Sequence, residues 1–182
     1  GNDIVEDLCQ ILNNNKTIEY LELYNKIREK VPNAILRTTV MVGFPGESEE
    51  QFQKLMDFVS KVRFERMGAF AYSEEEGTYS ALHYKDDIPM EVKEARLSKL
   101  MRLQQNISES IQEEKIGHIF DVVVDREEGD YYVGRTEFDS PEVDPEILLQ
   151  RSESPNLVIG NFYKVEITSS DSFDLYGKVI SK

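Results

Sequence analysis

The period of the hydrophobic pattern changes once along this chain of 182 residues, close to Gly117. Before Gly117, apolar residues recur at steps of three and four, the spacing of one face of an amphipathic helix. After it, Phe120, Val122 and Val124 alternate with polar neighbours, which is typical of half-buried strands. The sequence therefore predicts a helix-containing part followed by an all-β part.

Helices and strands are expected to alternate in the first part. The pattern predicts a helix over 17–31 that ends at Pro32, and then a strand over 34–42 that is covered on both faces. Ser48 begins a capping box ahead of a second helix, and residues 65–72 form the next candidate strand. This order predicts right-handed βα units around a parallel sheet.

The second part contains short strands separated by turns with the sequences EEGD, SPEVDP and SSDS. Short strands at this spacing predict a small antiparallel barrel of the OB-like kind. We therefore expect three regions: residues 1–88 with parallel strands, a long connecting helix over 89–116 that opens at Ile88-Pro89, and a β-barrel domain over 117–182.

Composition excludes several classes of protein. No apolar run approaches the roughly 18 residues of a membrane span, and the N-terminus lacks the segments of a signal peptide, so a cytoplasmic protein without a membrane partner is expected. Cys9 is the only cysteine, which excludes an intrachain disulfide and a multi-cysteine metal centre. Neither His83 nor His118 has a partner at metal-ligand spacing, so no metal ligand is expected in this chain.

The net charge of −14 opposes attraction to nucleic-acid phosphates and favours basic partners. Residues 113–182 hold 16 acids against 7 bases, a net charge of −9, so the β-barrel is the more acidic part.

Two stretches are candidate ligand sites. In VGFPGES, residues 42–48, a strand ends in a turn where Gly43 and Gly46 permit close approach of a ligand to backbone N–H groups, and Glu47 follows in the first helical turn. A P-loop would need Gly-Lys-Ser/Thr, which is absent. In AFAYSEEEGTYSA, residues 69–81, a strand ends at Tyr72 and Ser73 before three acids. The alternatives, an ordinary βα turn with a capping box and a solvated loop, stay open for the two stretches.

Together with VGRTEFDSPEVD in the β-domain, these stretches resemble the radical S-adenosylmethionine methylthiotransferases, most closely those of the RimO type. The resemblance runs from about Arg37 to the end. It implies an α/β fold in which a partial radical S-adenosylmethionine (βα) barrel segment is followed by a TRAM barrel. It also implies that S-adenosylmethionine lies against Thr39, Gly43, Pro45, Gly46, Glu47, Tyr72 and Ser73.

The family's C-x-x-x-C-x-x-C motif, which ligates a [4Fe–4S] cluster, is missing. We expect [4Fe–4S] clusters and S-adenosylmethionine in the intact enzyme, but no cluster and no activity in this chain alone. The family's Met-Arg-Arg-like segment is also missing, since ILNNNKT stands at 11–17, so the alignment of the residues before Thr17, and any cofactor contact from them, stay open. A half-barrel should expose a strand edge, through which the chain could associate with itself.

Within this family, the RimO type adds a methylthio group to an aspartate of a small-subunit ribosomal protein, and the MiaB type modifies an adenosine of tRNA. Chains of the MiaB type tend to have Tyr-Ser-x-Arg-x-Gly-Thr, whereas this chain has Glu75 at the arginine position. The acidic barrel likewise favours a basic ribosomal protein over tRNA. The candidate contact residues are Arg135, Asp139, Glu142, Asp144 and Glu146, although an ordinary solvated loop explains them equally well. The remaining alternatives are a MiaB-type fragment and a non-catalytic protein-binding module.

Overall fold

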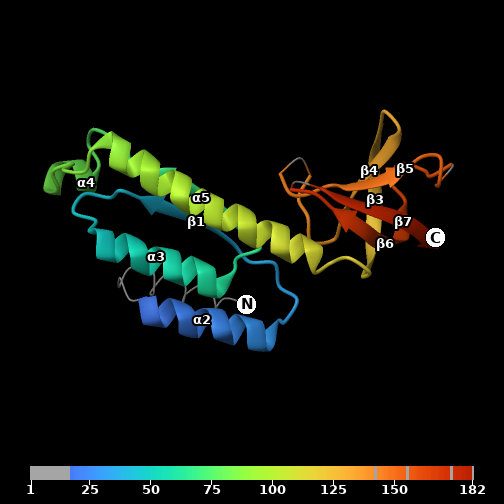
Figure 1. Cartoon of the computed structure of the whole chain (residues 1–182), viewed down its shortest axis with the longest axis horizontal. Helices are drawn as coiled ribbons and strands as arrows, with labels where there is room; N and C mark the ends of the chain where they lie inside the picture. Colours follow the sequence, from blue (N-terminus) through green and yellow to red (C-terminus); the bar gives the residue numbers. More distant parts are fainter. Residues whose placement is uncertain (1–16, 142, 155, 173, 182) are drawn as a thin grey trace. The chain divides into compact units, whose positions relative to one another are not determined.

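The computed structural model describes residues 17–141, 143–154, 156–172 and 174–181. The described chain divides into two compact units, residues 17–104 and the residues from Gln105 onward (Figure 1).

The first unit contains two parallel strands joined through a helix. Its elements are α2 (Thr17–Lys30), β1 (Arg37–Val42), α3 (Glu49–Val62), β2 (Arg66–Ala71), α4 (Tyr79–His83) and the first part of α5 (Met90–Glu113). Strands β1 and β2 pair in parallel from Arg37 opposite Arg66 to Val42 opposite Ala71. The parallel pairing predicted from the order of helices and strands is therefore confirmed, and α2 lies beside α3 (Figure 1).

Helix α3 begins where the sequence predicts. The hydroxyl of Ser48 accepts the N–H of Gln51, and the Gln51 side chain in turn accepts the N–H of Ser48, which completes the capping box. The helix ends at Arg63, whose left-handed backbone has φ of 51°. Four of its side chains are buried: Phe52, Met56, Val59 and Val62.

The expectation that β1 is covered on both faces is wrong. Burial alternates along β1, and Val42 is fully buried whereas Met41 is 40% exposed. On β2, Phe70 lies opposite Met41 and is 47% exposed. No described part of the chain covers this second face. The prediction was wrong because a continuous apolar run shows only that a strand is suited to burial, and not that another element covers it.

The second unit is a closed five-stranded barrel. Its strands are β3 (Ile119–Glu128), β4 (Tyr131–Thr136), β5 (Ile147–Gln150), β6 (Phe162–Ser170) and β7 (Leu175–Ser181), in the order β3-β4-β5-β7-β6. The core consists of Val122, Val124, Tyr132, Ile147, Leu149, Tyr163, Val165, Ile167 and Leu175.

The small barrel predicted from the short alternating strands is confirmed, but it is not purely antiparallel. Strands β5 and β7 pair in parallel, from Ile147 opposite Leu175 to Leu149 opposite Gly177. Five strands in a closed ring cannot all alternate in direction, so at least one neighbouring pair must be parallel. An alternating hydrophobic pattern carries no information on strand direction, and for that reason the sequence did not reveal the parallel pair.

Among the described residues, no helix is both long and apolar enough to cross a membrane.

Candidate functional site

The two candidate stretches of the first unit meet at one edge of the sheet. Parallel strands end at the same edge, and here the carbonyl of Val42 accepts the N–H of Tyr72 at 2.8 Å. The rings of Phe44 and Tyr72 lie edge to face with centroids 5.3 Å apart. The fold therefore brings together two turns that are about thirty residues apart in the sequence.

Six of the seven predicted cofactor residues lie in these two turns. Gly43, Pro45 and Tyr72 are buried, Glu47 is half-buried, and Gly46 and Ser73 are exposed. Thr39 lies apart from them, three residues before the end of β1 on its exposed face.

The N–H groups of the first turn already have partners within the chain. Gly43 donates to Oε1 of Glu47 at 3.1 Å, and Gly46 donates to Oδ1 of Asp87 at 2.9 Å. The N–H of Glu47 donates to the carbonyl of Phe44 at 2.9 Å. A ligand at this turn would therefore meet N–H groups that carboxylates and carbonyls of the chain already occupy.

The two glycines of the turn have different surroundings. Both have positive φ, 71° at Gly43 and 80° at Gly46. A Cβ at Gly43 would lie 2.5 Å from Cγ of Lys93, whereas a Cβ at Gly46 would have nothing within 4 Å. Gly43 thus admits a side chain of α5, and the space that a ligand could use is at Gly46.

Sequence reasoning missed two cationic residues of α5 at this site. Lys93 is 1% exposed and Arg96 is 8% exposed. They share the buried face of α5 with Leu100 and Gln104, at steps of three and four residues. That spacing was the available signal, but long charged side chains rarely lie on a buried helix face, so the sequence pattern did not single them out.

Lys93 contacts the end of β2. Its Nζ donates to the carbonyl of Tyr72 at 3.3 Å and lies 5.0 Å from the centroid of the Tyr72 ring. The same Nζ forms an ion pair with Oδ2 of Asp86 at 2.5 Å.

Arg96 contacts the turn that follows β1. Its Nη1 donates to the carbonyl of Glu47 at 3.1 Å and to Oε1 of the same residue at 2.7 Å. Its Nη2 lies 3.4 Å from Oε2 of Glu49 in the first turn of α3. Because the Glu47 carboxylate also accepts the N–H of Gly43, one carboxylate joins α5 to the beginning of the turn.

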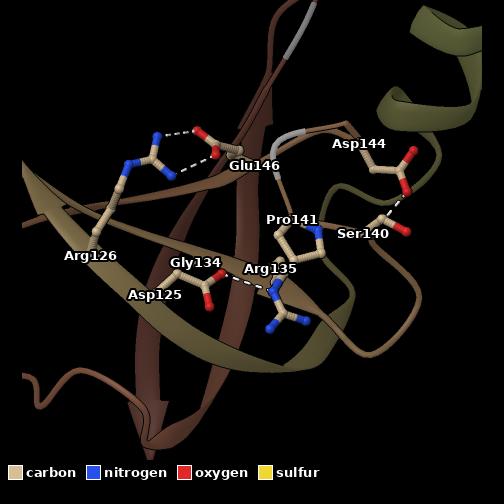
Figure 2. Close-up of a pocket in the computed structure, with 8 residues that line it drawn as sticks. All are labelled: Asp125, Arg126, Gly134, Arg135, Ser140, Pro141, Asp144 and Glu146. Carbon is tan, nitrogen blue, oxygen red and sulfur yellow. Dashed lines mark hydrogen bonds and ion pairs between the residues drawn. The ribbon is translucent and has the colours of Figure 1, made fainter.

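The second unit has a pocket of about 190 Å³ lined by charged side chains (Figure 2). Its lining residues are Asp125, Arg126, Gly134, Arg135, Ser140, Pro141, Asp144 and Glu146. Both arginines are paired inside it: Arg126 donates to both oxygens of Glu146 at 2.7 and 2.8 Å, and Nε of Arg135 lies 3.0 Å from Oδ2 of Asp125. The hydrogen bonds to Glu146 and Glu128 raise the pKa of Arg126, so the guanidinium remains charged.

The pocket brings together three of the five predicted substrate residues: Arg135, Asp144 and Glu146. Asp139 is outside it and buried, with Oδ2 accepting the Thr136 hydroxyl at 2.5 Å. Asp144 is also buried, and it accepts the N–H of Ser140 at 2.8 Å. Glu142 lies outside the described residues. The acids of this loop therefore differ in role, since two of them hold its shape.

A further acid stabilises the neighbouring strand connection. Oδ1 of Asp174 accepts the N–H of Glu146 at 3.1 Å, and its partial burial raises the pKa of the carboxyl. Within the described ranges, no group of three or more His, Cys, Asp or Glu side chains is arranged to hold a metal ion.

Comparison with known proteins identifies the second unit first. The family model of the TRAM domain matches residues 116–180, which include β3, β4, β5, β6 and all of β7 except its last residue.

Curated relatives cover the first unit as well. The ribosomal protein uS12 methylthiotransferase RimO of Bacteroides fragilis is 57% identical over 162 residues, which are 89% of this chain and 37% of that protein. The protein of the same name from Phocaeicola vulgatus is 59% identical over the same shares of both chains. That from Parabacteroides distasonis is 53% identical over 179 residues, which are 98% of this chain and 41% of that protein.

Over nearly its whole length, the chain is similar to one part of these RimO proteins.

RimO-family proteins are considerably longer than the region matched here, since the chain spans between 37% and 41% of the length of these relatives. The matched region includes a TRAM domain and covers nearly all of this chain. The resemblance inferred from VGFPGES, AYSEEEGTYSA and the β-domain is thereby confirmed.

Proposed function

We propose that this chain forms the second half of a radical S-adenosylmethionine barrel and the TRAM domain of a RimO-type methylthiotransferase. The observation that carries the proposal is the identity of 57–59% to proteins named uS12 methylthiotransferase over 89% of the chain. The parallel β1–β2 pair with its open face supports it, because a barrel segment requires a further set of strands to close.

S-adenosylmethionine would bind at the shared edge of β1 and β2, near Gly46, Ser73 and the exposed part of Phe44. This edge offers an open backbone at Gly46 and an aromatic ring that is 38% exposed at Phe44. The whole sequence has one cysteine, so its residues do not fit an iron–sulfur cluster, and the cluster ligands would come from a part of the enzyme outside this chain. The bound cofactor and clusters would supply the radical and sulfur chemistry.

The substrate would be an aspartate of a basic small-subunit ribosomal protein, recognised through the acidic TRAM domain in the cytoplasm. The net charge of −9 over residues 113–182 supports a basic partner and disfavours tRNA, whose phosphates attract Lys and Arg. Glu146 and Asp125 line the pocket of the TRAM domain, and both are partly exposed.

A chimera tests the enzymatic part of this proposal. The region of Bacteroides fragilis RimO that matches this chain would be replaced by the chain, and the product expressed in cells that lack their own RimO. We expect mass spectrometry of the ribosomal protein to show one added methylthio group on an aspartate. A soluble chimera that leaves that protein unmodified but modifies tRNA would move the assignment to the MiaB type.

Salt-dependent binding tests the role of the TRAM domain. The purified chain would be titrated with the ribosomal protein and, separately, with unmodified tRNA at increasing ionic strength. We expect binding to the protein alone, weakening with salt as rim charges are screened. Absence of binding to both would show that this chain does not recognise the substrate. It would also contradict the non-enzymatic alternative, in which the chain is a protein-binding module.

A further inference from the structure

Two cations one turn apart on α5 each bond to a backbone carbonyl of a different strand-end turn. Lys93 donates to the carbonyl of Tyr72 after β2, and Arg96 donates to the carbonyl of Glu47 after β1. Residues three apart lie on the same helix face, so a rigid turn of α5 spans both contacts. Helix α5 therefore connects the two turns in addition to the β1–β2 ladder, the bond between Tyr72 N–H and the Val42 carbonyl, and the ring contact of Phe44 with Tyr72.

Each cation also forms an ion pair with a carboxylate close to these turns. Asp86 pairs with Lys93 at 2.5 Å, and Glu47 pairs with Arg96 at 2.7 Å while accepting the N–H of Gly43. The next residue, Asp87, accepts the N–H of Gly46 at 2.9 Å. Backbone groups on both sides of the candidate ligand site are therefore held by charged side chains.

Packing alone does not account for these residues. Burial of a charged pair is seldom more favourable than apolar packing of the same volume, and Leu100 supplies such packing on the same face of α5. A charged side chain can, however, fix the position of a carbonyl, which an apolar side chain cannot do. Gly43 leaves room for the Lys93 stem, so that the cation reaches the Tyr72 carbonyl beneath the turn.

We propose that Lys93 and Arg96 are positioning residues that hold the two strand-end turns in the arrangement in which they bind their ligand. The identity of that ligand, S-adenosylmethionine, rests on the proposed function; the positioning of the turns does not.

Charge-neutral double variants separate positioning from simple stability. Lys93→Met alone leaves the partly buried carboxylate of Asp86 without its cation and should lower the melting temperature. Lys93→Met with Asp86→Asn removes both charges and should recover most of that loss, because replacing a whole buried pair is often neutral. The Tyr72 carbonyl still lacks its donor in the double variant. Arg96→Met with Glu47→Gln repeats the design at the other turn, since a glutamine oxygen can still accept the N–H of Gly43.

Amide hydrogen exchange of the full chain gives the deciding readout. In double variants with recovered melting temperature, we expect the amides of Gly43, Gly46 and Tyr72 to exchange about tenfold faster or more than in the unsubstituted chain. Val59→Ala, a cavity in the buried face of α3, is the matched control that lowers stability without touching the turns. Unchanged exchange of the turn amides in the double variants would overturn the proposal.

Calorimetric titration with S-adenosylmethionine adds the functional arm. We expect the double variants to bind about tenfold more weakly than the unsubstituted chain, and the Val59→Ala control to bind equally well. Equal affinity in a double variant would contradict positioning. If the unsubstituted chain itself fails to bind, the proposed cofactor site is at fault, and the exchange rates still decide the role of Lys93 and Arg96.

Discussion

At the scale of single residues, the surroundings of a glycine decide whether it leaves space for a ligand or for a side chain of the same chain. Gly43 and Gly46 belong to one turn and have nearly the same backbone conformation, with φ of 71° and 80°. The first faces the Lys93 stem and the second faces open space. Sequence reasoning gave both the same role, although only Gly46 is placed to admit a ligand.

Alanine substitutions distinguish the two positions. Gly46→Ala incurs only the backbone strain of a non-glycine residue at positive φ, about 1 kcal/mol of unfolding free energy. Gly43→Ala adds a clash with Cγ of Lys93 to the same strain, so we expect a loss of about 3 kcal/mol. Denaturant unfolding of both variants measures the difference. Equal losses would show that the Lys93 stem moves aside without penalty.

Asp174 makes the stability of the barrel dependent on pH. Burial raises the pKa of its carboxyl above the value of 3.8 for an unperturbed group, so the folded state binds the proton more tightly than the unfolded state. The contribution of Asp174 to stability is fully present below pH 3.8 and is lost as the pH rises through the folded-state pKa.

Asp174→Asn removes this titration and retains an oxygen that can accept the N–H of Glu146. We therefore expect the stability of the variant relative to the unsubstituted chain to increase as the pH rises above 3.8. Chemical denaturation between pH 3 and pH 7 provides the measurement. A difference that stays constant with pH would contradict the raised pKa.

At the scale of elements, α3 shows that a local signal can be read without tertiary information. The capping box of Ser48 and Gln51 is complete, and both of its partners lie within three residues of each other. Helix α5 shows the opposite case. The bonds of Lys93 and Arg96 to the strand ends cross 21 and 49 residues of sequence.

Loss of the cap should destabilise the first unit. Ser48→Ala removes the acceptor of the Gln51 N–H, and we expect a loss of about 1 kcal/mol. Ser60→Ala, at an exposed position inside the same helix, is the matched control and should change stability little, because alanine is the better helix former. Thermal unfolding followed by circular dichroism compares the two. A larger loss for Ser60→Ala would contradict the capping role.

At the scale of the whole molecule, the chain has a two-stranded parallel sheet in one unit and a closed barrel in the other. The closed barrel leaves no unpaired strand edge, whereas β1 and β2 pair only with each other among the described strands. A parallel sheet of two strands with one open face requires partners in order to bury its apolar side chains.

We predict that the isolated chain associates with itself through the outer edge of β1. The carbonyls of Leu36 and Val42 accept bonds from β2, so the alternation of the ladder directs the N–H of Thr39 to the outer edge. Thr39→Pro should therefore reduce association and preserve the β1–β2 pair. Val40→Pro, which removes a donor toward β2, should disrupt the pair itself.

Light scattering over a range of concentrations measures this association. A monomer at high concentration, or equal association of the unsubstituted chain and a folded Thr39→Pro variant, would contradict it.

The sequence by itself determined the helix–strand–helix–strand order over residues 17–72, the parallel direction of β1 and β2, the start of α3 and the small β-barrel. Each of these follows from periods, caps and turn residues that act over a few positions. Their consequence, the meeting of VGFPGES and AYSEEEGTYSA at one sheet edge, follows from the geometry of parallel strands.

Only the tertiary structure decided which of these residues are exposed and what they contact. It paired β5 with β7 in parallel, left Met41 and Phe70 uncovered, buried Asp139 and Asp144 in their loop, and placed two cations of α5 beneath the candidate site. The physical reason is common to all four. A side chain's burial and its charge partner depend on segments that are distant in the sequence, and hydrophobic periodicity reports only the preference of a residue for a face.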